Sequence, residues 1–289
     1  MKAGFVNIFG RPNAGKSTLM NALVGEKLAI VSSKVQTTRH RIKGIITEPG
    51  YQIVFSDTPG IIDPKYKLHE KMMMAVKSAL EDADIALLIA DIESDPEEET
   101  ALFSSLNLKS RTIILLNKID KLKEQKISEI TEKYLKAGIT KDIIPVSAIQ
   151  RINLDTVLNK IIEYLPHSEP FYSGEELSDL PTKFFVSELI REKIYELYKE
   201  EIPYHTAVII PEFKEKATLI KIRAEIIVQR ETQKGILLGE RGSSIKKLGT
   251  LSREEIEKFL GQKVFLELFV KVRPKWRDND QMLREYGYH

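Results

Sequence analysis

The sequence predicts two domains of different class: a doubly wound α/β domain with a mostly parallel sheet, followed by a smaller α+β domain. Four apolar segments in the first half, at 4–9, 51–56, 112–116 and 143–146, each run into a polar motif. That arrangement is typical of open α/β sheets, in which ligands bind at the carboxyl ends of the strands. The second half instead shows the order helix–strand–strand–helix–helix–strand. With 289 residues the chain is long enough for two cores.

Residues 166–181 separate these two patterns, because they are rich in proline, polar residues and acids. We therefore predict a first domain at 1–167, a linker at 168–181 and a second domain at 182–289. The second domain holds 21 Lys and Arg against 17 Asp and Glu, although the whole chain carries a net charge of only +2. This asymmetry mildly favours a polyanionic partner for the second domain.

The composition indicates in which cellular compartment the protein acts. The chain has no cysteine, which excludes disulfides, thiolate metal sites and a cysteine nucleophile. No apolar run approaches the roughly 20 residues of a membrane span, and the N-terminus carries no long apolar signal segment. We expect a soluble, cytoplasmic protein that acts as a monomer.

The first strand runs into a complete phosphate-binding loop, Gly-Arg-Pro-Asn-Ala-Gly-Lys-Ser, at residues 10–17. An amphipathic segment follows directly, so a strand, a glycine turn and a helix N-terminus aim backbone N–H groups at one point. Lys16 would reach the β- and γ-phosphates, and the Ser17 hydroxyl would bind Mg²⁺. The residues expected to hold the phosphates are Gly10, Arg11, Pro12, Asn13, Ala14, Gly15, Lys16, Ser17 and Thr18.

The next apolar strand ends in Asp-Thr-Pro-Gly at residues 57–60. The carboxylate of Asp57 can lie opposite the phosphate loop and hold Mg²⁺ through water. The Gly60 N–H can reach a γ-phosphate oxygen because no side chain intrudes. We expect this motif, with Thr58 and Pro59 between its ends, to sense the γ-phosphate.

Two further strand ends predict that the base is guanine. Asn117, Lys118 and Asp120 belong to an Asn-Lys-x-Asp motif, in which Asn117 is expected to act with Asp120. The Asp120 carboxylate can accept hydrogen bonds from the guanine N1–H and exocyclic amine, a donor pair that adenine lacks. Ser147 and Ala148 follow the last strand of the domain, and their backbone can contact the guanine O6.

The polar segment at residues 32–39 lies between the phosphate loop and Asp57 and shows no apolar periodicity. We predict that it forms a switch loop whose threonine hydroxyl completes the Mg²⁺ shell only while the γ-phosphate is present. Thr38 is the predicted metal ligand beside Ser17, and Thr37 is the alternative. The competing interpretation is a solvated loop that contains two threonines by chance.

Ile61 follows Asp-Thr-Pro-Gly at the position where Ras-like switches carry a glutamine that orients the attacking water. Isoleucine cannot hydrogen-bond to water, so we predict slow intrinsic hydrolysis of GTP, with the water placed by backbone groups and cations. Asn13 could bind a monovalent cation such as K⁺ that bridges the phosphates, or it could simply brace the turn. The predicted catalytic residues are Asn13, Lys16, Thr38, Asp57 and Gly60.

The order of elements in the second domain is that of a KH module, with Gly-x-x-Gly between its paired helices. The glycines of such a module let a nucleic-acid backbone approach two helix ends. An ordinary helix-to-helix turn is the other interpretation of four such residues. The predicted helices span 183–200, 234–238 and 243–260, and the predicted strands span 206–210 and 219–228, with the turn at 214–216, and 264–270.

A basic segment, Lys-Val-Arg-Pro-Lys-Trp-Arg, follows the last strand. Its four cations flank the only tryptophan of the chain, which suits phosphate contacts combined with base stacking. The alternative is that Trp276 packs on the core below a basic edge. Glu240 would repel phosphate, so the grip of the glycine loop on RNA is expected to be modest. The predicted RNA-binding residues are Gly239, Glu240, Arg241, Gly242, Lys246, Lys271, Arg273, Lys275, Trp276 and Arg277.

With these motifs placed, the chain resembles the Era family of bacterial GTPases over essentially its full length. The resemblance rests on GRPNAGKS, QTTR, DTPG, NKID and SA in the first domain and on GERG and KVRPKW in the second. It implies a Ras-like GTPase domain joined to a type II KH domain, with a role in assembly of the small ribosomal subunit. It also implies that the KH domain binds the 3′ end of 16S rRNA, and that the protein associates peripherally with the cell membrane.

Two other functions compete with this interpretation. A P-loop kinase would transfer the γ-phosphate to a small metabolite, but the guanine motif and the lack of an acceptor-pocket signature argue against it. A non-catalytic RNA-binding module could use GTP as a structural ligand, which Ile61 makes conceivable. Multiple turnover with free phosphate as product would exclude both.

Overall fold

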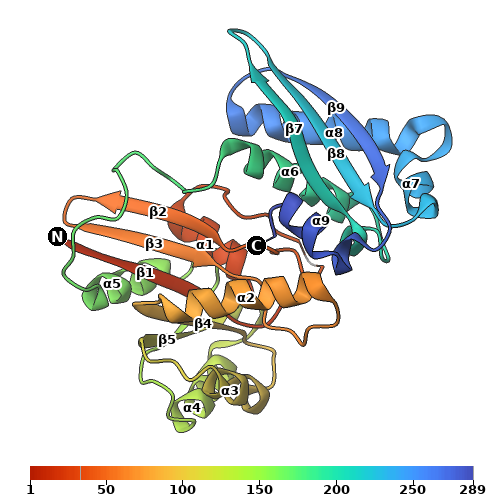
Figure 1. The fold of residues 1–289 in the computed structure, drawn as a ribbon. Helices are drawn as coiled ribbons and strands as arrows, with labels where there is room; N and C mark the ends of the chain where they lie inside the picture. The colour runs from red at the N-terminus through yellow and green to blue at the C-terminus, as the bar shows by residue number, and fades with distance from the viewer. Residues whose placement is uncertain (33, 289) are drawn as a thin grey trace. The chain divides into compact units, whose positions relative to one another are not determined.

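The protein is described here by a computed structural model, which covers residues 1–32 and 34–288 and folds into two compact units. The first unit takes in Met1–Asp63 and Met72–Asp179, and the second takes in Pro64–Lys71 and Leu180–His289 (Figure 1). Ser33, which belongs to the predicted switch loop, and His289 lie outside the described residues.

A six-stranded sheet forms the centre of the first unit. Its strand order is β2-β3-β1-β4-β5-β6, and all neighbouring strands are parallel except the antiparallel pair of β2 and β3. The predicted mostly parallel α/β sheet is confirmed, and two strands without a nucleotide motif, β2 and β4, add to the four that were predicted. The strands are β1 (Lys2–Phe9), β2 (Ile42–Glu48), β3 (Tyr51–Asp57), β4 (Ile85–Asp91), β5 (Arg111–Asn117) and β6 (Ile143–Val146).

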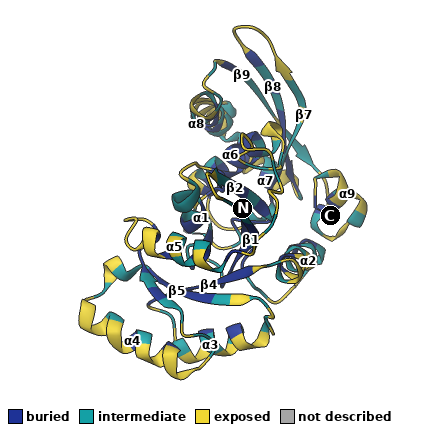
Figure 2. Cartoon of the chain, turned by 90° about the vertical axis from the view of Figure 1, so that its left-hand side faces the viewer, coloured by how far each residue is buried: buried dark blue, intermediate teal, exposed yellow. Residues whose placement is uncertain are grey.

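Helices cover both faces of this sheet. One face packs against a core to which α2, α3 and α4 contribute Val76, Phe103 and Tyr134, while α1 and α5 contact each other on the opposite side. Figure 2 shows buried strands between helices whose outer faces are exposed. Because the strands are parallel, the loops that follow β1, β3, β5 and β6 meet at one edge of the sheet. The helices are α1 (Lys16–Val24), α2 (Lys67–Glu81), α3 (Pro96–Ser105), α4 (Glu124–Lys136) and α5 (Leu154–Tyr164), with a short η1 (Ile119–Lys121).

The segment predicted as a linker follows the edge of this sheet. The Ile45 N–H on β2 donates to the carbonyl of Leu177 at 2.9 Å. Two residues further along the segment, Asp179 pairs with the Lys43 ammonium at 2.7 Å. These contacts occupy an edge strand that would otherwise expose unpaired backbone groups. Residues 168–179 therefore lie within the first unit.

The second unit contains a three-stranded sheet covered on one face by helices. β8 pairs with β7 antiparallel and with β9 parallel. Alternate residues of β8, among them Ile222 and Ile226, are fully buried in a core shared with α6 and α8. The predicted KH-type order of elements is confirmed. The elements are α6 (Thr182–Leu197), η2 (Pro203–His205), β7 (Ala207–Glu215), β8 (Ile220–Val228), α7 (Glu231–Leu238), η3 (Glu240–Gly242), α8 (Ser243–Leu260), β9 (Val264–Val272), η4 (Trp276–Asp278) and α9 (Asp280–Glu285).

One turn of the second unit differs from its prediction. β7 continues through Glu215, so the turn lies at 216–219, where the Lys216 N–H donates to Leu219 O. An irregularity in the pairing between Ile209 and Glu212 carries β7 past the apolar run on which the prediction relied. Among the helices in the described parts of the chain, none is long and apolar enough to cross a bilayer.

Candidate functional site

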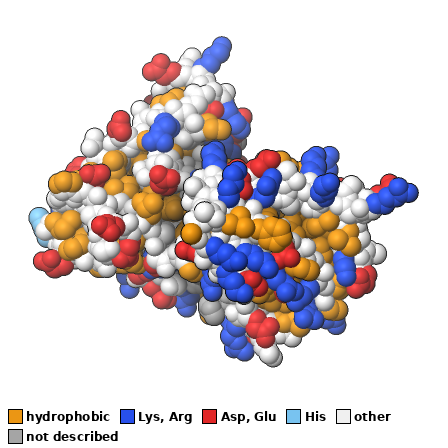
Figure 3. Space-filling view, turned by 90° about the horizontal axis from the view of Figure 1, so that it is seen from above, with side chains coloured by type: hydrophobic (Ala, Val, Ile, Leu, Met, Phe, Trp, Pro, Cys, Tyr) orange, Lys and Arg blue, Asp and Glu red, His pale blue; other side chains and the backbone are white. Residues whose placement is uncertain are grey.

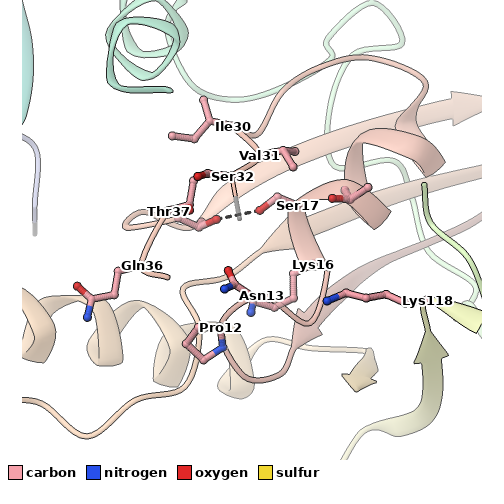
Figure 4. A pocket seen from close by; sticks show the side chains of 14 residues that line it. Pro12, Asn13, Lys16, Ser17, Ile30, Val31, Ser32, Gln36, Thr37 and Lys118 are labelled. Carbon is pink, nitrogen blue, oxygen red and sulfur yellow. Dashed lines mark hydrogen bonds between the residues drawn. The ribbon is translucent and has the colours of Figure 1, made fainter. Parts of the chain in front are cut away.

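A cavity of about 340 Å³ opens between the phosphate loop and residues 30–38 (Figure 4). Segments far apart in the sequence meet there, because Lys118 follows β5 and faces a cavity lined by the start of α1. The predicted nucleotide-binding residues that line the cavity are Pro12, Asn13, Gly15, Lys16, Ser17, Thr18, Thr38, Gly60 and Lys118. The remaining predicted residues lie outside this lining, namely Gly10, Arg11, Ala14, Asp57, Thr58, Pro59, Ile61, Asn117, Asp120, Ser147 and Ala148.

The shape of the phosphate loop depends on two of its glycines. A Cβ on Gly10 would lie 2.3 Å from the carbonyl oxygen of Ile89. A Cβ on Gly15, whose φ is +104°, would lie 2.1 Å from Asn117 Nδ2. Real Cβ atoms do not approach neighbours so closely, so only glycine allows the loop to pass against β4 and β5 before α1 begins.

Lys16 is buried at the floor of the loop. Its Nζ donates to the carbonyls of Gly10 and Arg11 at 3.1 and 2.9 Å. Burial lowers the pKa of Lys16 to about 8, although the negative charges of Asp57 and Glu99 oppose that shift. A triphosphate would supply anionic oxygens to this desolvated ammonium and would restore its preference for the charged form.

Three oxygen-bearing side chains meet beside this lysine. Ser17 Oγ donates to Asp57 Oδ2 at 2.6 Å, Thr38 Oγ1 donates to the same oxygen at 3.1 Å, and the two hydroxyls are 2.9 Å apart. Asp57 is fully buried, and burial raises its pKa. Among the described residues, its Oδ1 has no hydrogen-bond partner. A buried carboxylate with an unused oxygen and two hydroxyls is an all-oxygen donor set that fits Mg²⁺.

The same geometry separates the two candidate threonines. Thr37 Oγ1 donates to the carbonyl of Lys34 at 2.7 Å, within the switch loop itself. Thr38 instead contacts both Ser17 and Asp57. The structure therefore favours Thr38 as the threonine of the metal site.

The Asp-Thr-Pro-Gly motif is fastened to the first strand and to the phosphate loop. Thr58 Oγ1 donates to the carbonyl of Ile8 at 2.6 Å, which ties the end of β3 to β1. Gly60 lies directly against Pro12, because a Cβ at Gly60 would come within 2.8 Å of the Pro12 nitrogen. Gly60 thus lies against the loop that would hold the phosphates, and its predicted contact with the γ-phosphate stays a prediction.

Ile61 presents no polar side chain to the cavity. Its N–H donates to the carbonyl of Gly10 at 3.2 Å, and its side chain is partly buried against the core that contains Phe9. Asn13, by contrast, is exposed on the loop and lines the cavity (Figure 4). Any side-chain help for a water molecule would therefore have to come from a residue other than Ile61.

Asn117 forms hydrogen bonds within the fold, whereas its predicted action on guanine together with Asp120 stays a prediction. Its Nδ2 donates to the carbonyl of Ala14 at 2.8 Å, and its Oδ1 accepts from the Ala148 N–H at 3.0 Å. Both ends of the carboxamide are thereby used to join the phosphate loop to the segment after β6. Asp120 accepts a hydrogen bond from Ser147 Oγ, which leaves the carboxylate as the group suited to read the base.

Sequence reasoning missed a partly exposed network of hydrogen bonds at the end of the switch loop. Arg41 donates to both carboxylate oxygens of Asp82 at 2.6 and 2.9 Å and to Ser56 Oγ at 3.0 Å. The fully buried Asn7 donates to the same carboxylate at 2.7 Å. These residues belong to no sequence motif, because their contacts join β1, β3 and the end of α2 through tertiary packing. The network fixes the chain just beyond Thr38.

The Gly-x-x-Gly loop of the second unit is exposed, and its two glycines adopt backbone conformations with positive φ. Gly239 and Gly242 have φ of +70° and +78°, and a Cβ on Gly239 would lie 2.1 Å from Ser244 Oγ. Arg241 also adopts a positive φ, of 50°, and its side chain is exposed beside Glu240. Figure 3 shows Lys and Arg side chains gathered on part of the face in view. The loop and its surroundings are accessible to a polyanion.

The basic segment after β9 is less available than predicted. Trp276 is fully buried, and its Nε1 donates to the carbonyl of His205 at 3.1 Å. The prediction that it stacks on an RNA base is therefore wrong for this structure, and the alternative of core packing holds. Lys271 pairs with Glu225 at 2.6 Å, and Arg277 lies over the Tyr66 ring at 4.2 Å. The predicted RNA-binding residues with exposed side chains are Glu240, Arg241, Lys246, Arg273 and Lys275.

The fold and the cavity together define a class: a P-loop guanine-nucleotide-binding protein whose α/β unit precedes a KH unit. Residues 5–118 match the family model described as 50S ribosome-binding GTPase, and residues 201–277 match the KH domain model. GTPase Era of Geobacter sp. (strain M21) is 43% identical over 99% of this chain and 98% of its own length. GTPase Era of Geotalea uraniireducens (strain Rf4) is 41% identical over the same shares. The chain belongs to the Era family of GTPases.

Solved structures agree with this assignment. A crystal structure of Era in complex with MgGDPNP and nucleotides 1506–1542 of 16S ribosomal RNA is 38% identical to this chain and covers all of it. Its TM-score is 0.96, and 99% of that chain is covered. A crystal structure of a point variant of Aquifex aeolicus Era bound to GDP.AlF4⁻ matches with the same values. The resemblance drawn from the motifs is confirmed, and membership of a GTPase family decides against the kinase alternative.

Proposed function

We propose that this protein is a GTP-hydrolysing switch that binds the 3′ end of 16S rRNA and acts in assembly of the small ribosomal subunit. The observation that carries the proposal is the cluster of Ser17, Thr38 and Asp57 beside the buried Lys16, in a chain whose second unit exposes a Gly-x-x-Gly loop. One Era relative of known structure, which matches along this whole chain, carries both MgGDPNP and nucleotides 1506–1542 of that RNA.

The nucleotide roles follow from the side chains that line the cavity. Lys16 and the backbone N–H groups of the loop would hold the phosphates, and Gly60 would offer its N–H to the γ-phosphate. Ser17 and Thr38 would hold Mg²⁺ directly, with Asp57 behind them. When bound, this ion would neutralise charge on the β- and γ-phosphate oxygens. Thr38 would leave the metal when the γ-phosphate is lost, because it is the member of the cluster that lies on a switch loop.

Hydrolysis would proceed without a side-chain partner at position 61. The Ile61 side chain is turned into the core, so backbone groups and the phosphates themselves would place the attacking water. The Asn13 carboxamide lines the cavity and would add a K⁺ site if its oxygen faces the phosphates. Turnover of GTP in KCl and NaCl at equal ionic strength tests this point: faster turnover in KCl supports the site, and equal rates would eliminate it.

Gating of RNA binding is the regulatory part of the proposal. GTP would order the loop that carries Thr38 and the segment after Gly60, and this would favour the RNA-competent state of the second unit. Arg241, Lys246, Arg273 and Lys275 would contact the RNA backbone, because their cationic side chains are exposed to solvent. The two domains would be joined near residues 180–181, because residues 168–179 lie within the first unit. Binding to ribosomal RNA would require a cytoplasmic location. We also propose peripheral association with the cell membrane, which cell fractionation would test.

The decisive experiment measures RNA affinity in three nucleotide states. A labelled RNA of the sequence that corresponds to nucleotides 1506–1542 is titrated with protein in the presence of MgGDPNP, MgGDP or no nucleotide. We expect the tightest binding with MgGDPNP, with a difference from MgGDP of fivefold or more, on the order of 1 kcal/mol. Equal affinity in all three states would refute the gating, and no binding in any state would refute the RNA role as well.

A further inference from the structure

Glu99, in the first turns of α3, carries a buried carboxylate that the proposed function does not use. Its side chain is 2% exposed, whereas that of its neighbour Glu98 is 71% exposed. The end of the helix does not need it, because Asp95 already caps α3 by accepting from the Glu97 N–H at 2.9 Å. A glutamate is rarely buried without a partner, so its position calls for a specific counter-charge.

That counter-charge comes from the phosphate loop. Arg11 Nε lies 2.9 Å from Glu99 Oε1, and Arg11 NH2 lies 3.5 Å from the exposed Glu98. Among the described residues, the other carboxylate oxygen of Glu99 is buried without a hydrogen-bond partner. Arg11 is therefore the anchor of this carboxylate, and removing the arginine would leave a buried charge uncompensated.

The pair reaches the phosphate-binding lysine through the backbone. Arg11 is the second residue of the loop, and its carbonyl accepts from Lys16 Nζ at 2.9 Å. A chain of contacts thus runs from the Glu99 carboxylate to the Arg11 guanidinium, along the Arg11 backbone, and on to Lys16. The charge of Glu99 also favours the protonated form of that lysine. Contacts of this kind fix a loop whose amides must already point at the phosphates before the nucleotide arrives.

We propose that Glu99 is a positioning residue for the nucleotide: by holding Arg11 it keeps the phosphate loop in the conformation that binds the β- and γ-phosphates. The inference rests on the proposed GTPase function. Because the loop holds phosphates before and during hydrolysis, the effect should fall on binding rather than on the chemical step. The hydrolysis rate of bound GTP depends instead on Asp57, Thr38 and Gly60.

The direction of the change in nucleotide affinity distinguishes a positioning role of Glu99 from simple charge repulsion between its carboxylate and the phosphates. Glu99→Gln keeps the shape of the side chain and removes its charge. If the carboxylate only repelled phosphate, the variant would bind nucleotide more tightly. If Glu99 positions the loop, both GDP and GDPNP should bind about five- to tenfold more weakly, with kcat within about twofold of the wild type.

The experiment compares Glu99→Gln, Arg11→Ala, the double variant and Glu98→Gln as the matched exposed control. Dissociation constants for fluorescent GDP and GDPNP, kcat and KM for GTP, and the melting temperature are measured for each protein. We expect the double variant to bind no more weakly than the worse single variant, because both changes break one connection. Glu98→Gln should bind as the wild type does.

Unchanged or tighter nucleotide binding by folded Glu99→Gln would overturn the proposal, as would strictly additive losses in the double variant. If Glu99→Gln unfolds, the melting temperature shows it, and the double variant then decides, because it leaves no buried charge without its partner. A wild-type protein that binds neither nucleotide would instead refute the proposed function, so the two failures are distinguishable.

Discussion

The nucleotide cavity of the first unit and the Gly-x-x-Gly loop of the second unit are built in opposite ways. Around the cavity, Lys16, Asp57 and Asn117 are buried, and each is held by hydrogen bonds within the fold. In the glycine loop, Glu240 and Arg241 are exposed, and the loop owes its shape to backbone conformations with positive φ. A preorganised interior suits bond-breaking chemistry, whereas an exposed cationic loop suits a partner that brings its own shape.

Substitutions at the two sites should therefore differ in the size of their effect on binding. In the cavity a single change disturbs several buried partners, so its effect on nucleotide binding should be large. On the loop a single change removes one phosphate contact and leaves the fold intact, so its effect on RNA affinity should be small.

Removing the buried ammonium should have the largest effect. Lys16→Ala deletes the charge that contacts the Gly10 and Arg11 carbonyls at the floor of the loop, and GTP affinity should fall by about a hundredfold or more. Equilibrium binding of a fluorescent GTP analogue measures the change. Lys126→Ala on the exposed face of α4 is the control, and a loss in Lys16→Ala no greater than in this control would contradict the assignment of the cavity.

Exchange of the base-reading carboxylate should come next. Asp120→Asn replaces an acceptor by an amide that can donate, so affinity for GTP should fall by roughly tenfold to a hundredfold. The same variant should gain affinity for xanthosine triphosphate, whose ring carries a carbonyl where guanine carries an amine. Competition binding with the two nucleotides measures both changes, and loss of both affinities would show that Asp120 only supports the fold through Ser147.

The lowered pKa of Lys16 predicts a pH effect of intermediate size. The folded, nucleotide-free protein loses the lysine proton near pH 8, whereas the unfolded chain keeps it to about 10.5. Its stability should therefore rise between these values, because there the unfolded state binds more protons. GTP needs the charged lysine, so its affinity should fall by about fivefold between pH 8 and pH 9, as the protonated fraction of Lys16 falls.

Lys16→Arg provides the control for this titration, because arginine stays protonated throughout the range. Its GTP affinity, weaker or not, should be flat between pH 7 and pH 9. A wild-type affinity that is equally flat would show that the ammonium titrates at a higher pH than its burial implies.

Single changes on the RNA surface should have the smallest effects. Arg241→Ala and Lys246→Ala should each weaken RNA binding by about three- to fivefold. Each should also reduce the steepness of log binding constant against log salt concentration by about one unit, because one phosphate contact is lost. GTP hydrolysis should be unchanged. Lys214→Ala, near the end of β7, is the matched control, and an equal loss there would mean that RNA binding is not centred on the glycine loop.

The sequence predicts the first site well and the second site partly, for physical reasons. Phosphate, Mg²⁺ and guanine each demand particular groups, so Lys16, Ser17 and Asp120 can be named from residue type and order. Thr37 and Thr38 could be separated only by the structure, since their difference lies in which hydroxyl faces Asp57. The role of Asn117 was equally hidden, because tertiary packing turns its amide toward the loop.

Side-chain direction in irregular segments was the main source of error. Lys275 adopts a positive φ of 55°, and the short helix that follows carries Trp276 into the core. A basic stretch around one tryptophan does not reveal that reversal. Lys271 is similarly used within the sheet, since β9 places it beside Glu225 in the parallel pair with β8. Cations in regular strands are thus poorer candidates for RNA contact than their composition suggests.

Reciprocal linkage between nucleotide and RNA tests whether the two units are coupled. If GTP strengthens RNA binding, RNA must strengthen binding of the GTP analogue by the same factor. The measurement is the dissociation constant of MgGDPNP, and of MgGDP as the control, with and without saturating RNA corresponding to nucleotides 1506–1542. We predict that RNA tightens MgGDPNP by fivefold or more relative to MgGDP, on the order of 1 kcal/mol. An identical change for both nucleotides, or none for either, would show that the nucleotide state and RNA binding are not coupled.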